Sequence, residues 1–290
     1  MTEVNYLESL NPLQYESVCS TEGPNLIIAG AGTGKTKVLT TRVAHIIDNN
    51  LAFPSQILCV TFTNKAAREM SERVQKLVSQ NMEKMPWMGT FHSIGAKIIR
   101  NHAEVIGLKQ SFTILDKDDQ LSLIKQIIKS ENLDQSQFSP KLIQSKIDHW
   151  KNKALNPNDI KSESLDNLVD EKSLSIYKIY QARLFEINCL DFGDLLLQCI
   201  NLFKVPDIHK RYSNNFKYIH VDEYQDTNAA QYKWLKLLGS HHQNVCCVGD
   251  DDQSIYSWRG AEVDNMLRFE KEFKNAKVIR LKQNYRSTNN

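Results

Sequence analysis

The chain has 290 residues, of which 41% are hydrophobic and 24% are charged, and its formal net charge is +2. This length and balance exclude a disordered or collagen-like chain and indicate a globular protein with one large domain or two ordinary ones. Because the charge is nearly balanced, composition gives no argument for nucleic-acid binding, and any such argument must come from local features.

The N-terminal segment MTEVNYLESL has no basic region leading into an apolar one, and no apolar run approaches the length of a membrane span. We therefore expect a cytoplasmic protein. The six cysteines show no C-x-x-C spacing and are expected to be reduced core residues. The adjacent pair His241 and His242 lies in a polar turn without a cysteine or acidic partner at metal spacing, so no zinc site is expected.

A glycine-rich turn follows the first predicted strand, within the segment NLIIAGAGTGKT. Glycines at alternate positions permit positive φ angles, which turn backbone N–H groups inward as a nest for phosphate oxygens. Lys35 can reach the β- and γ-phosphates of a nucleotide, and the Thr36 hydroxyl can hold Mg²⁺. The strict pattern has glycine where this chain has Ala29, so an ordinary glycine turn is the alternative. We predict a phosphate-binding loop formed by Ala29, Gly30, Ala31, Gly32, Thr33, Gly34, Lys35 and Thr36.

Continuous apolar runs recur along the chain and alternate with helical periods. Such runs are typical of strands buried on both faces of a parallel sheet. The expected strands are Leu26–Ala29, Ile57–Phe62, Trp87–Phe91, Tyr218–Val221, Val245–Val248 and Val278–Leu281. From about residue 93 to 212 the apolar residues follow a helical period, and no strand pattern returns until Lys217. We therefore predict an α/β core with a parallel sheet, formed by residues 1–92 and 213–290, and an inserted, mostly α-helical subdomain formed by residues 93–212.

Two adjacent carboxylates follow the fourth predicted strand, in the segment YIHVDEYQD. Carboxylates at the carboxyl end of a parallel strand lie beside a phosphate loop at the same sheet edge. We predict that Asp222 is a Mg²⁺ ligand and that Glu223 is the general base that activates water. The alternative is that both residues simply begin a solvated loop.

The segments AGAGTGKT, VDEYQDTN, VGDDDQSIYSWRGA and QNYRS occur in this order. Together they closely resemble the motifs of UvrD/Rep/PcrA-like superfamily 1 DNA helicases, and the resemblance covers nearly the whole chain. It implies a RecA-like ATP-binding core and an ATP-dependent helicase that moves 3′ to 5′ along single-stranded DNA, acts at junctions of single- and double-stranded DNA, and serves repair or replication. Related ATP-dependent exonuclease subunits share these motifs more loosely.

The resemblance also implies roles in the ATP site that residue types alone would not suggest. Gln14 resembles the residue whose amide reads adenine, Tyr285 the ring that stacks on it, and Arg42 the group on the other face. Gln253 resembles the residue that links the γ-phosphate to the DNA site, and Arg286 a cationic contact to that phosphate. Without the resemblance, each would be read as a surface or turn residue.

The expected DNA site rests on aromatic residues at strand ends, because base stacking on aromatic rings tolerates any sequence. These rings are Phe62, Phe91, Tyr256 and Trp258, and the neighbours expected to contact phosphates or bases are Thr63, Asn64, Thr90, His92 and Arg259. The alternative is that these aromatic side chains pack in the hydrophobic core and do not contact DNA. We favour stacking for Tyr256 and Trp258, which lie among Gly, Ser, Asp and Arg.

The segment Leu190–Leu196, LDFGDLL, resembles a further family motif, and its leucines are expected only to pack. The sequence ends shortly after QNYRS, whereas the helicases it resembles continue into a second RecA-like half that supplies an arginine finger. Two functions therefore stay open: the N-terminal half of a helicase, or a nucleotide- and DNA-binding module that is inactive alone. A third and weaker alternative is that the chain belongs to a subunit of an ATP-dependent exonuclease. The chain alone is expected to bind ATP–Mg²⁺ weakly, hydrolyse it poorly and unwind nothing.

Overall fold

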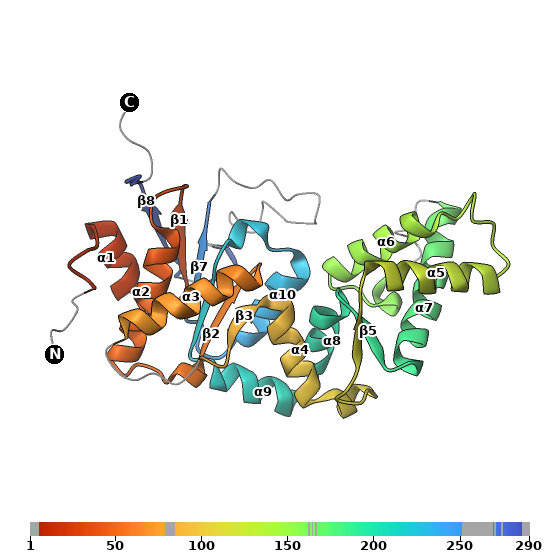
Figure 1. Ribbon diagram of the computed structural model, residues 1–290, viewed down its shortest axis with the longest axis horizontal. Helices are drawn as coiled ribbons and strands as arrows, with labels where there is room; N and C mark the ends of the chain where they lie inside the picture. The colour runs from red at the N-terminus through yellow and green to blue at the C-terminus, as the bar shows by residue number, and fades with distance from the viewer. Residues whose placement is uncertain are drawn as a thin grey trace. The chain divides into compact units, whose positions relative to one another are not determined.

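The computed structural model describes residues 6–78, 85–161, 163, 165, 167–250, 269, 271–273 and 275–285. These residues form two compact units, shown in Figure 1. The first unit consists of the described residues of Met1–Ile94, Pro206–Thr227 and Leu235–Asn290. The second unit consists of the described residues of Gly95–Val205 and Asn228–Trp234.

The first unit is built on a parallel sheet with six strands among the described residues, in the order β3-β2-β6-β7-β1-β8. The strands are β1 (Asn25–Ala29), β2 (Ile57–Thr61), β3 (Met88–Thr90), β6 (Tyr218–Val221), β7 (Val245–Gly249) and β8 (Lys277–Leu281). Each of the six predicted strands is present, and the α/β class with a parallel sheet is confirmed. Because all neighbours are parallel, the carboxyl ends of the strands meet at one edge.

Burial on both faces explains the continuous apolar runs. Every residue of β1, β2 and β7 is buried. Burying one Ile or Val side chain contributes roughly 1.5–3 kcal/mol, so these short strands gain most of their stability from the helices that cover them. Helices α2 and α3 lie side by side across one face of the sheet (Figure 1).

The helices of the first unit begin at recognisable caps. Asn11 caps α1 by accepting a hydrogen bond from the Gln14 backbone, and Thr63 caps α3 in the same way from Ala66. The helices are α1 (Pro12–Cys19), α2 (Lys35–Asp48), α3 (Asn64–Leu77) and α9 (Pro206–Asn215), with the short helices η1 (Pro54–Gln56) and η5 (Tyr224–Asp226). Two further helices, α4 (Phe91–Asn101) and α10 (Ala229–Leu238), have residues in both units.

The second unit is mostly helical, as predicted. Its elements are η2 (Ala103–Ile106), α5 (Lys117–Ser130), α6 (Pro140–Asn152), η3 (Pro157–Asp159), α7 (Leu168–Glu186) and α8 (Asp194–Leu202). It also holds a parallel pair of strands, β4 (Thr113–Leu115) and β5 (Cys189–Asp191). The prediction of a mostly α-helical segment did not include this short pair of strands. Strands of three residues are too short to produce a periodic apolar pattern.

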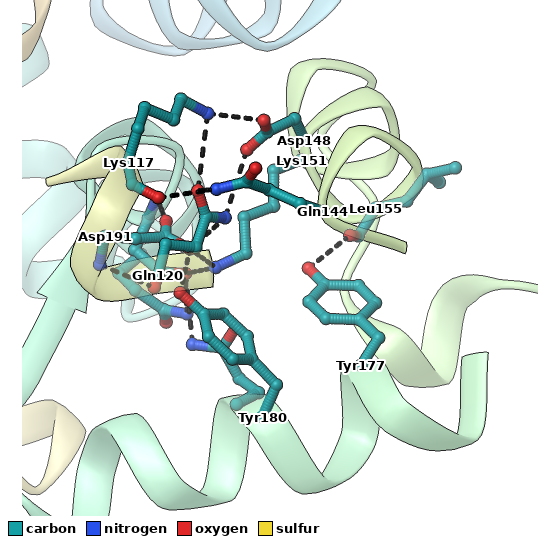
Figure 2. A network of polar contacts seen from close by, with 12 residues as sticks. Lys117, Gln120, Gln144, Asp148, Lys151, Leu155, Tyr177, Tyr180 and Asp191 are labelled. Atoms are coloured by element: carbon teal, nitrogen blue, oxygen red, sulfur yellow. Dashed lines mark hydrogen bonds and ion pairs between the residues drawn. The ribbon is translucent and has the colours of Figure 1, made fainter. Parts of the chain in front are cut away.

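A buried ionic cluster joins the elements of the second unit (Figure 2). Lys151 Nζ on α6 lies 2.7 Å from Asp191 Oδ2 and 2.9 Å from Asp194 Oδ1, and all three side chains are buried. The Tyr180 hydroxyl on α7 donates to Asp191 Oδ2 at 2.9 Å. We call Lys151, Asp191 and Asp194 the Lys151 cluster. The leucines of LDFGDLL pack as expected, but the two aspartates between them carry a role that was not predicted.

All six cysteines are free, as predicted; five of them are buried and Cys19 is partly exposed. None of the helices in the described part of the chain combines the length and apolar character needed to cross a lipid bilayer.

Candidate functional site

The carboxyl edge of the six-stranded sheet brings together the glycine-rich loop and three carboxylates. The loop follows β1, Asp222 and Glu223 follow β6, and Asp250 follows β7. Strand β7 lies between β6 and β1, so Asp250 projects from the strand between the other two groups. Ligands of parallel α/β sheets bind at this edge, where helix N-termini and loops face solvent.

The loop has the backbone conformation of a phosphate nest. Gly32 has φ of 82° and Gly34 has φ of 90°, which other residues rarely adopt. Gly34 caps α2, and within the described part of the chain no side chain caps the N-terminal N–H groups of that helix. These groups and the positive end of the helix dipole are therefore available to an anion.

Lys35 is held loosely between two carboxylates. Its Nζ atom lies 3.3 Å from Asp250 Oδ2 and 3.7 Å from Glu223 Oε2. Asp250 is 1% exposed, whereas the Glu223 side chain is 38% exposed, so solvent reaches one side of the arrangement. Sequence reasoning missed Asp250, although it directly follows an apolar strand, as Asp222 does.

Asp222 and Glu223 lie in different environments. Asp222 is buried, and burial together with the neighbouring Glu223 charge raises its pKa to about 6. Glu223 has φ of 52°, an uncommon left-handed conformation for a glutamate. Gln225, also missed, donates to Glu223 Oε2 at 2.8 Å and accepts from the Asp250 backbone at 3.0 Å. Gln225 therefore fixes the position of Glu223 relative to β7.

Thr36 and Asp222 offer the oxygen ligands that Mg²⁺ prefers, one hydroxyl on the first turn of α2 and one carboxylate. The raised pKa of Asp222 fits such a site, because a buried carboxylate without a cation of its own is costly to ionise. The donor set is thus compatible with the predicted metal.

Gln14 and Tyr285 both contact the glycine-rich loop. Gln14 Nε2 donates to the Thr33 carbonyl at 2.9 Å, and the Tyr285 N–H donates to the Gly32 carbonyl at 2.9 Å. Asn11 links them, since its Nδ2 atom donates to the Tyr285 hydroxyl at 2.8 Å and its side chain caps α1 at Gln14. The Tyr285 ring is 56% exposed and can present a face to a ligand.

Arg42 does not fit the predicted stacking role. Its side chain is 1% exposed, and its guanidinium donates to the carbonyls of Ser17 at 2.6 Å and Thr21 at 3.1 Å. Arg42 thus anchors the end of α1 from inside the core. Lys37 is an exposed cation on the same helix, and its Nζ donates to the Ser9 carbonyl at 2.6 Å.

The residues that follow β2 and β3 form a second group at the same sheet edge. Phe62 is partly exposed, but Phe91 is 1% exposed and packs against it with 5.5 Å between ring centroids. Phe91 is therefore a core residue and does not fit the predicted stacking role. Thr63 and Thr90 accept hydrogen bonds from the first turns of α3 and α4. Burial lowers the pKa of His92 to about 4, so this side chain is neutral at pH 7.

Five predicted site residues lie outside the described residues. They are Gln253, Tyr256, Trp258, Arg259 and Arg286. Asn64 is described and is exposed at the start of α3.

Sequence comparison agrees with this combination of loop, sheet and carboxylates. The chain belongs to the UvrD/REP helicase N-terminal domain family, whose model matches residues 10–274. It is 51% identical over 292 residues to DNA helicase II of Rickettsia typhi, covering 99% of this chain and 44% of that protein. It is 50% identical over 283 residues to ATP-dependent DNA helicase PcrA of Staphylococcus aureus. This match covers 97% of this chain and 38% of that protein. The chain thus spans less than half the length of these relatives.

Proposed function

We propose that the chain is the ATP-binding part of a DNA helicase that moves 3′ to 5′ along single-stranded DNA, in repair or replication. The observation that carries this proposal is the Lys35 site, where a phosphate nest, a lysine and three carboxylates meet at one sheet edge. The names of the relatives support the reaction class, since they are DNA helicases. The domain limits and the cytoplasmic location stay predictions from the sequence.

In the proposed reaction the glycine-rich loop and Lys35 bind the β- and γ-phosphates of ATP. When the phosphates take up the ammonium charge, Glu223 loses part of its ion pair and becomes a better proton acceptor. Glu223, which Gln225 holds in place by a hydrogen bond, then accepts the proton of the attacking water. Thr36 and Asp222 would hold Mg²⁺, which would supply charge neutralisation at the phosphates.

Gln14 and Tyr285 are proposed to bind the adenine base, with Lys37 rather than Arg42 as the neighbouring cation. Phe62, Thr63, Asn64, Thr90 and His92 are proposed to contact single-stranded DNA. The roles predicted for Tyr256, Trp258 and Arg259 at DNA, and for Gln253 and Arg286 at the γ-phosphate, are kept as proposals.

Glu223→Gln tests the general base. The amide keeps its size but cannot accept a proton, so ATP binding should persist while DNA-stimulated hydrolysis falls by about two or more powers of ten. Binding is measured with a fluorescent ATP analogue and turnover by phosphate release, in the 290-residue chain and in a relative of full length. Lys129→Gln, an exposed change in the second unit, serves as the control and should alter neither. Unchanged turnover in Glu223→Gln would refute the assignment.

A nucleotide- and DNA-binding module without turnover is the second candidate. This candidate is favoured by the long distances from Lys35 Nζ to its two carboxylate partners. In such an open site, groups from outside this chain would have to complete the contacts to the phosphate. ATP binding without DNA-stimulated hydrolysis by the 290-residue chain would support it.

A further inference from the structure

The second unit contains a pocket of about 550 Å³ that is separate from the phosphate loop. Its walls come from η3, α7 and α8. A volume of this size is in the range of small-molecule sites.

Two glutamine residues belong to the lining of the pocket. Gln181 and Gln198 line the pocket, and both donate to Asp194 Oδ1 of the Lys151 cluster, at 3.0 and 3.5 Å. Gln198 is 5% exposed. Gln181 Oε1 is buried and accepts no hydrogen bond within the described part of the chain. A buried acceptor without a donor is costly. Because Gln181 Oε1 is closed to solvent, a ligand N–H can satisfy it only after the Gln181 amide turns toward the pocket.

The pocket lining also carries positive charge and one aromatic ring. Lys178 and Lys204 line it and are exposed, and Phe185 is partly exposed on the same helix as Gln181. The one carboxylate of the lining, Asp159, accepts hydrogen bonds from the Asn156 backbone at 2.8 Å and side chain at 2.7 Å. These bonds occupy one of its oxygens but do not cancel its charge. Although burial raises the pKa of Asp159, these bonds and the nearby charge of Lys204 lower it overall. The two lysines and one carboxylate give the lining a net charge of +1.

We propose that this pocket binds one nucleotide unit. The base lies against the Phe185 ring and donates an N–H to Gln181 Oε1, and the phosphate faces Lys178 and Lys204. Aromatic stacking, amide pairing and lysine contacts are the means by which proteins hold unpaired nucleotides. The unit is either a free mononucleotide or one unstacked nucleotide of a strand. The inference goes beyond the proposed function, which concerns residues of the first unit.

Photo-crosslinking tests the proposal in the 290-residue chain. The probes are 4-thio-dTMP and a short single-stranded oligonucleotide with one 4-thiothymidine, and trypsin digestion followed by mass spectrometry maps the site. Cleavage after Arg183 and Lys204 releases a peptide that contains Phe185 and Gln198. A crosslink in this peptide is expected. Its formation with both probes indicates a free nucleotide, and its formation with the oligonucleotide alone indicates a strand.

Matched variants separate a specific pocket from general attraction. The double variant Lys178→Glu with Lys204→Glu should lower the crosslink yield in the corresponding peptide about tenfold. In this variant the peptide extends to Lys210, because Lys204→Glu removes a trypsin site. Lys125→Glu with Lys129→Glu reverses two exposed charges on α5 of the same unit and should leave the yield within about twofold. Phe185→Leu keeps the charge and should lower the yield several-fold by removing the stacking surface.

A missing crosslink in this peptide, or equal losses in both double variants, overturns the proposal. Failure of the proposed function has a different signature, because it removes nucleotide turnover and crosslinks to peptides of the first unit.

Discussion

Two clusters in this molecule have the same composition, one lysine with two carboxylates, but opposite construction. Lys35 lies 3.3 and 3.7 Å from its carboxylate partners, and its side chain is 13% exposed. Lys151 lies 2.7 and 2.9 Å from its partners, and its side chain is 0% exposed. The first arrangement leaves the ammonium able to exchange partners, whereas the second does not.

The difference shows how to distinguish a binding site from a structural element. In the Lys151 cluster, hydrogen bonds from Tyr180 and Gln181 satisfy the carboxylates, so the charges are compensated within the unit. In the Lys35 site, the glycine-rich loop leaves its helix N-terminus uncapped by side chains and one carboxylate faces solvent. The charges of the Lys35 site are therefore incompletely compensated by protein groups, and this is the site where a charged ligand is expected.

The largest expected effect is on stability, from Lys151→Met. This change leaves Asp191 and Asp194 buried together without a cation and should cost about 3–5 kcal/mol of unfolding free energy. Urea denaturation measures the loss, with the exposed Lys129→Met as control. A loss below about 1 kcal/mol would show that the cluster is not the structural element that the comparison requires.

The next effect is on ligand binding, from Lys35→Ala. Loss of a charged contact to phosphate should weaken ATP binding by about ten- to a hundredfold. The unfolding free energy should fall by less than half as much as in Lys151→Met, since solvent reaches Glu223. Equal destabilisation by the two changes would remove the distinction between the clusters.

Arg42→Met separates an anchoring role from the predicted stacking role. Removing the guanidinium leaves the Ser17 and Thr21 carbonyls without their donor and should cost about 1–3 kcal/mol. A stacking residue would instead lower affinity for ATP more than affinity for inorganic triphosphate, with stability unchanged. Denaturation and the two binding constants decide between them.

The smallest effect is a pH dependence that has opposite signs for Asp222, next to the Lys35 site, and for Asp191 of the Lys151 cluster. Burial and Glu223 raise the Asp222 pKa to about 6 from an ordinary value near 3.8. The folded state therefore holds this proton more tightly, and the stability contribution of Asp222 increases as the pH falls through 6. Asp222→Asn should stabilise the unliganded chain by about 1–2 kcal/mol at pH 7 and less at pH 5.

Asp191 provides the contrast to Asp222. Although burial raises the pKa of Asp191, Lys151 outweighs this and holds it below its ordinary value, so its contribution is lost as the pH falls. Asp191→Asn should destabilise the chain at pH 7. Urea unfolding at pH 5 and 7 measures both variants, and destabilisation by Asp222→Asn at pH 7 would contradict the argument.

Much of the first unit was predictable from sequence because continuous apolar runs and a glycine-rich turn leave strong local signals. Asp222 could be found because it directly follows such a run, and the same signal was available for Asp250. Arg42 was misjudged because its stacking role was taken from the family resemblance without regard to its position on the helix. It lies four residues after Val38 and three after Leu39, on the buried face of α2.

The Lys151 cluster could not be predicted because it depends on tertiary contacts. Lys151 and Asp191 are 40 residues apart, and a lysine near the end of an amphipathic helix resembles any surface lysine in the sequence. The strands β4 and β5 were missed for a related reason, since each is only three residues long and is defined by its partner.

The order in which the site is synthesised follows from the position of β7. Lys35 precedes its buried partner Asp250 by 215 residues. At elongation rates of about 5–20 residues per second, a nascent chain carries the glycine-rich loop for roughly 10–40 seconds before that carboxylate exists. Strand β1 also has both of its neighbours, β7 and β8, in this late part of the chain. The loop that binds phosphate in our proposal thus leaves the ribosome well before the strands that flank β1 in the sheet.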